Sequence, residues 1–338
     1  LLLGLLSPQS SCSTAFLCPV RLVQNPSRPR QLFSCLHPKM SSEGETKNSD
    51  GLKLFTKKWL PSGAPKAVLF IIHGAGEYCE RYEEAAQKFN SKGIAVFSHD
   101  HQGHGNSEGT QMHVENFADY TNDTLQYFRE TLEANPTLAT LPRFIWGHSM
   151  GGKIAAQILI RAEEEKLELS AAVLTGPALM VDPGTDNAIN RFLARTLSKI
   201  APKFAVPWEK GPVAKFTVCG DPGREKAYRE DPKNYHGCLR VNWAWQFIKG
   251  IDYVVEHAEK CTMPVLGMHG TEDGICVPAG TERWIGRIAS KDKKFSSYQG
   301  AFHELHNDVE ETRNKALDEI QAWMDAHMTP PKPSSAYV

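Results

Sequence analysis

The fold is decided by residues 144–162, which have the sequence FIWGHSMGGKIAAQILIRA. The first three residues form an apolar run that predicts a buried strand, and the apolar positions after Gly151 recur at helical spacing. Between them, residues 147–151 match the pattern G-x-S-x-G, in which a serine occupies a sharp turn from strand to helix. Glycines let the chain turn without clashes, and the N-terminus of the helix favours negative charge beside the serine. Ser149 is therefore the candidate nucleophile.

Buried apolar runs alternate with amphipathic segments on both sides of this stretch. Strands are predicted at 67–72, 95–97, 144–146, 171–175, 265–268 and 295–298. Helices are predicted at 81–91, 117–132, 151–162, 189–200, 279–288 and 304–328. Such alternation is typical of βαβ units, and it predicts a mostly parallel central sheet flanked by helices.

The alternation lapses after residue 175 and resumes at Val265. Seven prolines lie between residues 176 and 263 among short helical fragments, which indicates a helical cap inserted before the strand that carries the catalytic acid. The predicted divisions are an N-terminal extension at 1–42, a catalytic domain at 43–328 with its cap at about 177–262, and a flexible tail at 329–338.

The N-terminal extension differs in composition from the rest of the chain. No Asp or Glu precedes Glu43, whereas Arg, Ser, Pro and Leu are frequent. Two interpretations stay open. The segment is either a transit peptide or weak signal that targets an organelle, or a leader upstream of a true start at Met40.

Composition excludes several classes of protein. The net charge is −1 with no long run of either sign, so nucleic acid is not an expected partner. No apolar stretch approaches the roughly 18 residues that a membrane-spanning helix needs. The eight cysteines are scattered without a C-x-x-C pair, which indicates reduced thiols and a cytoplasmic location.

A serine nucleophile needs a general base and an acid that orients the base. In chains with this type of turn the order is serine, then Asp or Glu, then His. Asp273 and His303 each follow one of the last two predicted strands, so they are the predicted acid and base. Their rivals are Glu272 and His306, of which the latter falls one turn further along the predicted C-terminal helix.

The loop after the first buried strand supplies the other half of the predicted site. The strand at 67–72 ends in the segment HGAGE at 73–77, whose glycines predict a tight turn. The backbone N–H groups of Ala75 and Met150 are predicted to form the oxyanion hole.

Two histidine-rich segments raise the alternative of a metal site. Residues 99–104 read HDHQGH, but Asp100 does not stand where the usual dinuclear pattern needs it. Residues 303–307 read HELHN, whereas the zinc-protease pattern H-E-x-x-H needs its second His at position 307. We therefore predict a hydrogen-bonded turn at 99–104, no metal and no organic cofactor.

Several segments resemble one known family, both in their residues and in their order. They are HGAGE (73–77), RYEE (81–84), HDHQGHGNSEG (99–109), GHSMGGKIA (147–155), HGTEDGIC (269–276) and AFHELH (301–306). Together they resemble the monoglyceride lipases, and more broadly the lysophospholipase-like, serine aminopeptidase S33-type α/β hydrolases. The resemblance covers about 51–328, is weakest through the cap, and implies the α/β-hydrolase fold.

The resemblance also implies a chemistry. It implies cleavage of monoacylglycerols, with lysophospholipase, broad carboxylesterase or S33-type peptidase activity as alternatives, and a non-catalytic binding protein as the remaining one. It implies substrate contacts by Glu77, Arg81, Tyr228 and His148, and a thiol near the site at Cys276. Arg81 and Tyr228 have a second interpretation, as a surface ion pair and a core aromatic. The cap is implied to hold the acyl chain of a lipid ester and to contact membranes peripherally.

Overall fold

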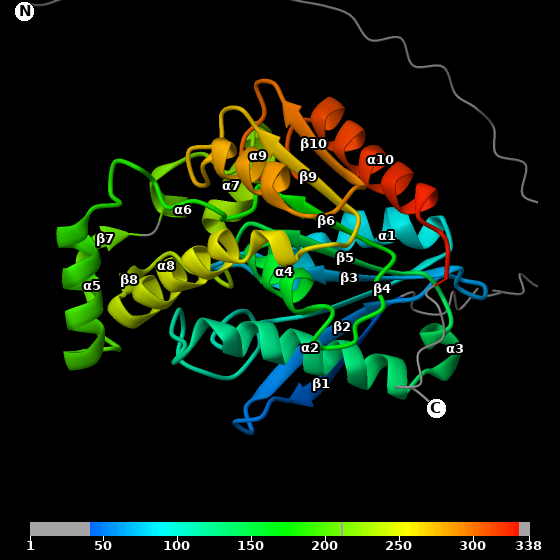
Figure 1. The fold of residues 1–338 in the computed structure, drawn as a ribbon, viewed down its shortest axis with the longest axis horizontal. Helices are drawn as coiled ribbons and strands as arrows, with labels where there is room; N and C mark the ends of the chain where they lie inside the picture. The colour runs from blue at the N-terminus through cyan, green and yellow to red at the C-terminus, as the bar shows by residue number, and fades with distance from the viewer. Residues whose placement is uncertain (1–40, 211, 331–338) are drawn as a thin grey trace, which may run out of the picture. The chain divides into compact units, whose positions relative to one another are not determined.

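The computed structural model describes residues 41–210 and 212–330, and it has the predicted alternation of strands and helices (Figure 1). The strands are β1 (Ser41–Lys47), β2 (Lys53–Trp59), β3 (Ala67–Ile72), β4 (Ile94–His99), β5 (Arg143–His148), β6 (Ala171–Thr175), β7 (Ala205–Lys210), β8 (Cys238–Arg240), β9 (Val265–Gly270) and β10 (Lys293–Tyr298). The helices are η1 (Cys79–Tyr82), α1 (Glu83–Ser91), α2 (Phe117–Glu133), α3 (Pro136–Ala139), α4 (Met150–Arg161), α5 (Ala188–Ile200), α6 (Pro212–Lys215), α7 (Pro222–Glu230), α8 (Val241–Glu256), η2 (Ala258–Lys260), α9 (Pro278–Arg287) and α10 (Glu310–Ala326). The two interpretations of the N-terminal extension, and most of the predicted tail, concern residues outside those described.

Eight strands form one sheet in the order β1-β2-β4-β3-β5-β6-β9-β10. From β4 to β10 all neighbouring strands are parallel, whereas β1 and β2 add an antiparallel edge that the sequence analysis did not predict. The chain therefore has the α/β-hydrolase architecture, with a mostly parallel sheet flanked by helices (Figure 1).

Both faces of the sheet are covered, which explains why β3 is apolar at every position. Its even-numbered side chains lie in one core cluster with residues of α2, α4, α8 and α9. Its odd-numbered side chains lie in a second cluster with residues of α1 and α10. Parallel strands buried on both faces lose the polar alternation of half-exposed strands.

The cap lies between β6 and β9 and contains α5, α6, α7, α8 and a two-stranded sheet of β7 and β8. Helix α8 packs against α2 and α4, and α5 packs against α8 at the outer end of the cap (Figure 1). None of the helices in the described ranges has the length and apolar content needed to cross a bilayer.

The predicted C-terminal helix was wrong at its start. It begins at Glu310 rather than Glu304, and the residues before it form turns. The Asp308 carboxylate accepts hydrogen bonds from the N–H groups of Phe302 (2.9 Å), Gly220 (3.1 Å) and Val309 (2.7 Å). These bonds hold the segment in a loop, since a carboxylate that binds nearby backbone donors competes with helix formation.

Candidate active site

Ser149 occupies the turn between β5 and α4 in a strained conformation. Its φ of 55° and ψ of −118° are rare for a residue with a side chain. A Cβ atom on Gly147 would lie 2.3 Å from the Gly151 carbonyl oxygen, and one on Gly151 would lie 2.0 Å from the Ile72 carbonyl oxygen. Both outer positions of G-x-S-x-G must therefore be glycine for α4 to start this close to the sheet.

The loops after β9 and β10 bring Asp273 and His303 into contact. The Nδ1 atom of His303 lies 2.7 Å from Asp273 Oδ2, and both side chains are buried. His303 and Ser149 line the same small cavity. The Ser149 Oγ atom lies 4.0 Å from the Sγ atom of Cys276. Among the residues that the structure describes, Ser149 forms no hydrogen bond with the His303 ring. In enzymes without substrate this bond is often long or misaligned and tightens only in the complex.

Electrostatics keep the Asp273 carboxylate ionised beside the His303 ring. Burial by itself raises the pKa of Asp273, but the neighbouring imidazoles of His303 and His269 hold that pKa well below its usual range. Burial likewise lowers the pKa of His303, and the Asp273 carboxylate outweighs this effect and raises it above its ordinary value. A carboxylate that stays ionised beside the ring is what a general base needs for orientation and charge stabilisation.

His269 is a site residue that the sequence analysis missed. Its Nε2 atom lies 2.9 Å from Asp273 Oδ2, and its Nδ1 atom lies 2.7 Å from Thr281 Oγ1. The other carboxylate oxygen accepts the N–H groups of Ile275 (2.8 Å) and Cys276 (2.9 Å). The acid is thus held in place by hydrogen bonds to both of its oxygens. The only signal in the sequence was the position of this His, four residues before Asp273 and near the end of strand β9.

The residues predicted for the oxyanion hole lie at the same cavity or beside it. Ala75 lines the cavity together with Gly74. Met150 is the first residue of α4, so its N–H has no acceptor within the helix. The Glu77 carboxylate accepts the Gly74 N–H at 2.6 Å and shapes this loop. The role of the two amides as oxyanion donors stays a prediction.

A buried ion cluster forms the polar end of the site. Arg81 donates two parallel hydrogen bonds to Glu304, each of 2.7 Å, and a third of 2.5 Å to Glu77. Its guanidinium carbon lies 4.5 Å from the centre of the Tyr228 ring. The interpretation of Arg81 as a surface ion pair was therefore wrong, because its side chain is only 10% exposed and its partners Glu77 and Glu304 are buried. Sequence reasoning missed Glu304, which directly follows the predicted base.

Charge in this cluster is unevenly distributed. Burial raises the pKa of Glu77, and Arg81 offsets only part of that effect. Burial also acts to raise the pKa of Glu304, but the bidentate contact with Arg81 reverses this and lowers it below the usual range. Tyr228 and His148 line the cavity beside the cluster, and the Nδ1 atom of His148 lies 3.0 Å from the Thr175 carbonyl oxygen.

Comparison with known proteins places the chain in a family. Residues 63–310 match the family described as serine aminopeptidase, S33. The chain belongs to this family. The monoglyceride lipase of Homo sapiens is 33% identical over 277 residues, which cover 82% of this chain and 88% of that protein. The monoacylglycerol lipase of Mycolicibacterium smegmatis is 31% identical over 278 residues, which cover 82% and 95%. The crystal structure of Paleococcus ferrophilus monoacylglycerol lipase is 25% identical, with a TM-score of 0.68, and the match covers 81% and 99%.

Among the described residues, neither rival side chain of this S33 hydrolase forms a hydrogen bond with the side chains of Asp273 and His303. The Glu272 side chain is exposed. His306 stacks on Tyr82 at 4.8 Å and packs edge-on against Trp146, and burial lowers its pKa to about 3. It lies in a turn rather than in the predicted helix.

The segment HDHQGH forms a hydrogen-bonded turn in this S33 chain, as its sequence predicted. The Asp100 carboxylate accepts the N–H groups of Cys79 and Asn106, each at 2.8 Å. The rings of His73 and His101 lie 4.2 Å apart, and the N–H of His101 donates to His73 Nε2 at 3.0 Å. Within residues 41–210 and 212–330, no cluster of three or more His, Cys, Asp or Glu side chains has a metal-binding arrangement.

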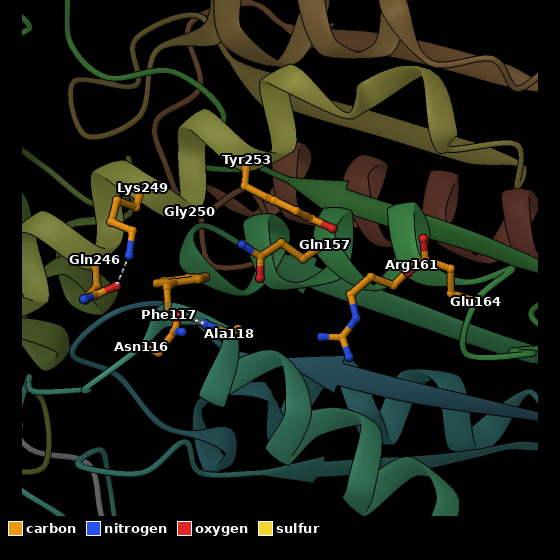
Figure 2. A pocket seen from close by; sticks show the side chains of 10 residues that line it. All are labelled: Asn116, Phe117, Ala118, Gln157, Arg161, Glu164, Gln246, Lys249, Gly250 and Tyr253. Atoms are coloured by element: carbon orange, nitrogen blue, oxygen red, sulfur yellow. Dashed lines mark hydrogen bonds between the residues drawn. The ribbon is translucent and has the colours of Figure 1, made fainter.

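A second and larger hollow lies away from Ser149. It is a groove of about 350 Å³ between the N-terminus of α2 and helices α4 and α8. Figure 2 shows Arg161 at one end of this groove and Lys249 and Gln246 at the other. It is lined by none of the predicted site residues, whereas Ser149 and His303 both line the smaller cavity.

Proposed function

We propose that this chain is a serine hydrolase that cleaves monoacylglycerols to a fatty acid and glycerol through an acyl-enzyme intermediate. The observation that carries the proposal is the buried 2.7 Å contact between His303 and Asp273, at a cavity shared with the strained Ser149. The S33 relatives named monoglyceride and monoacylglycerol lipases support the choice of substrate.

Acylation begins when His303 Nε2 accepts the Ser149 proton. Asp273 keeps the other ring proton on Nδ1, so Nε2 is free to act as the base. The Ser149 oxygen attacks the ester carbonyl, and the N–H groups of Ala75 and Met150 hold the oxyanion. His303 then gives its proton to the glycerol oxygen, glycerol leaves, and the acyl group remains on Ser149. Water attacks this ester by the same route and releases the fatty acid.

The cap supplies the apolar wall of the site and a surface for lipid. Val213 and Val218, both cap residues, line the cavity together with the polar cluster. Large apolar side chains on and just after α5 are exposed by 43% to 74%, namely Ile189, Phe192, Leu193, Leu197, Ile200 and Phe204. A helix face of this kind lies in the interface of a membrane, where single-tailed lipids partition.

Flotation with vesicles tests this membrane contact. The double substitution of Ile189 and Phe192 by Glu should reduce flotation with phosphatidylcholine vesicles that contain 1-oleoylglycerol. The control is Leu60→Glu, which places one such charge at an exposed leucine outside the cap. Equal flotation of both variants and the wild-type protein would remove the cap surface from the proposal.

Activity assays test the reaction itself. A fluorophosphonate probe should label the wild-type chain and fail to label Ser149→Ala. Rates on 1-oleoylglycerol should exceed those on 1-oleoyl-lysophosphatidylcholine and on p-nitrophenyl butyrate. A preference for the short ester by orders of magnitude would replace the lipase by a carboxylesterase, and absence of labelling would indicate a binding protein.

A further inference from the structure

The lining of the cavity at Ser149 contains acidic side chains and, among the described residues, no lysine or arginine. The acidic side chains are the carboxylates of Glu77 and Glu304. Both carboxylate side chains are nearly inaccessible to solvent, at 3% and 2% exposure. Water therefore screens them little, and a ligand in the cavity meets their charge directly.

The nearest cation is already occupied. One terminal nitrogen of Arg81 donates to both Glu77 and Glu304, the other donates to Glu304, and the face of the guanidinium lies over Tyr228. A phosphate is bound bidentately by two parallel N–H groups of a free guanidinium, whereas both terminal nitrogens of Arg81 already donate to carboxylates and Arg81 does not line the cavity. Arg81 therefore neutralises the cluster in part but is not available to a ligand.

Glu304 is held rigidly in this position. Its N–H donates to the Val218 carbonyl of the cap at 2.8 Å, and its Oε2 atom accepts from Asn307 Nδ2 at 2.9 Å. It directly follows His303 in the chain. The carboxylate therefore cannot swing away from an incoming headgroup without disturbing the loop that carries the base.

We infer that Glu304 determines the charge of the alcohol that this site accepts: esters of neutral alcohols such as glycerol are hydrolysed, and esters whose alcohol carries a phosphate are rejected. This inference rests on the proposed function. Carboxylate oxygens are acceptors, so they pair with glycerol hydroxyls, whereas a phosphate offers them only like charge. Glu304 acts here as a specificity residue rather than as a part of the bond-breaking step.

The test compares two substrates that differ only in the phosphate. These are 1-decanoylglycerol and 1-decanoylglycerol 3-phosphate, both used below the concentrations at which they aggregate. For the wild-type chain, kcat/KM should favour the neutral ester by about 100-fold, as expected for like charges about 6 Å apart at an effective dielectric constant of about 20. Glu304→Gln should shrink this ratio by about tenfold or more, because it removes a charge and partly frees Arg81.

Matched variants separate specificity from stability. Glu311→Gln makes the same chemical change at an exposed position at the start of α10 and should leave the ratio unchanged. Melting temperature and fluorophosphonate labelling report whether Glu304→Gln is folded. If it is not, Glu77→Gln removes the other lining carboxylate and should shift the ratio in the same direction.

The outcomes are distinguishable. Equal rates of the wild-type chain on both esters would overturn the inference and leave the proposed function standing. A Glu304→Gln variant that loses activity on both esters equally would show a merely structural role, and would also overturn it. Failure of the wild-type chain to cleave either ester would overturn the proposed function, and the inference with it.

Discussion

Replacing Asp273 by Asn tests whether one buried carboxylate decides the tautomer and charge of His303. The Oδ1 atom of Asp273 accepts two backbone N–H groups, from Ile275 and Cys276, so the amide oxygen of Asn must stay there. The amide nitrogen then takes the place of Oδ2, 2.7 Å from His303 Nδ1. Since that nitrogen donates, Nδ1 must accept, and the ring proton moves to Nε2, which then cannot accept the proton of Ser149.

The expected loss follows from the same distance. Unit charges on His303 and Asp273, with N and O 2.7 Å apart, interact by about 6 kcal/mol at an effective dielectric constant of about 20. That energy is an upper limit for the imidazolium of the transition state, and it corresponds to about 10⁴ in rate. We expect kcat/KM to fall by about 10³ to 10⁴. The acidic limb of any residual activity should move to lower pH, because the carboxylate that raises the pKa of His303 is gone.

The assay is kcat/KM on 1-oleoylglycerol and p-nitrophenyl butyrate as a function of pH, with melting temperature as the check on folding. Asp292→Asn is the matched control, since Asp292 Oδ2 lies 2.9 Å from His327 Nε2 in an exposed Asp–His pair outside the cavity. It should keep wild-type activity. A folded Asp273→Asn variant that retains more than about a tenth of the wild-type kcat/KM would refute the reasoning.

Three further predictions concern folding and stability. Gly151→Ala should abolish folding, because its Cβ would lie 2.0 Å from the Ile72 carbonyl oxygen; soluble yield and circular dichroism check this, and a folded, labelled variant would contradict it. Lys153→Met should raise the free energy of unfolding at neutral pH by about 1 kcal/mol. The Lys153 amine is buried with the Phe247 carbonyl as its hydrogen-bond acceptor, and its lowered pKa shows that burial of the charged amine costs free energy, which an apolar side chain avoids. Urea unfolding measures it, and a loss of stability would show that the aromatic rings beside the amine stabilise its charge. Burial lowers the pKa of His99 to about 4, so as the pH falls this ring is protonated in the unfolded chain before it is protonated in the folded chain. The free energy of unfolding should therefore fall by about 3 kcal/mol between pH 6.5 and pH 4. A folded His99→Phe variant should show a shallower fall, and an unchanged pH dependence would exclude this histidine as a cause.

Some elements of the fold were predictable because their signals are local. The apolar run of β3 predicted both of its ends, since burial on two faces leaves no polar position within the strand. In contrast, β1 has the polar sequence SSEGETK and is mostly exposed. It is a strand because β2 pairs with it along its whole length, and no pattern within seven polar residues reports that pairing. The start of α10 was likewise displaced by the tertiary hydrogen bonds of Asp308.

By itself the sequence determined the position of the predicted nucleophile, since glycine spacing and the change from strand to helix at Ser149 are properties of one continuous segment. Only the tertiary structure decided which groups surround the predicted acid and base. Arg81 and Glu304 are 223 positions apart and meet through two hydrogen bonds of 2.7 Å, and His269 reaches Asp273 because the strand β9 ends in a tight loop. Burial and ion pairing depend on distances between loops, and those distances are set by the packing of the whole sheet rather than by any local pattern.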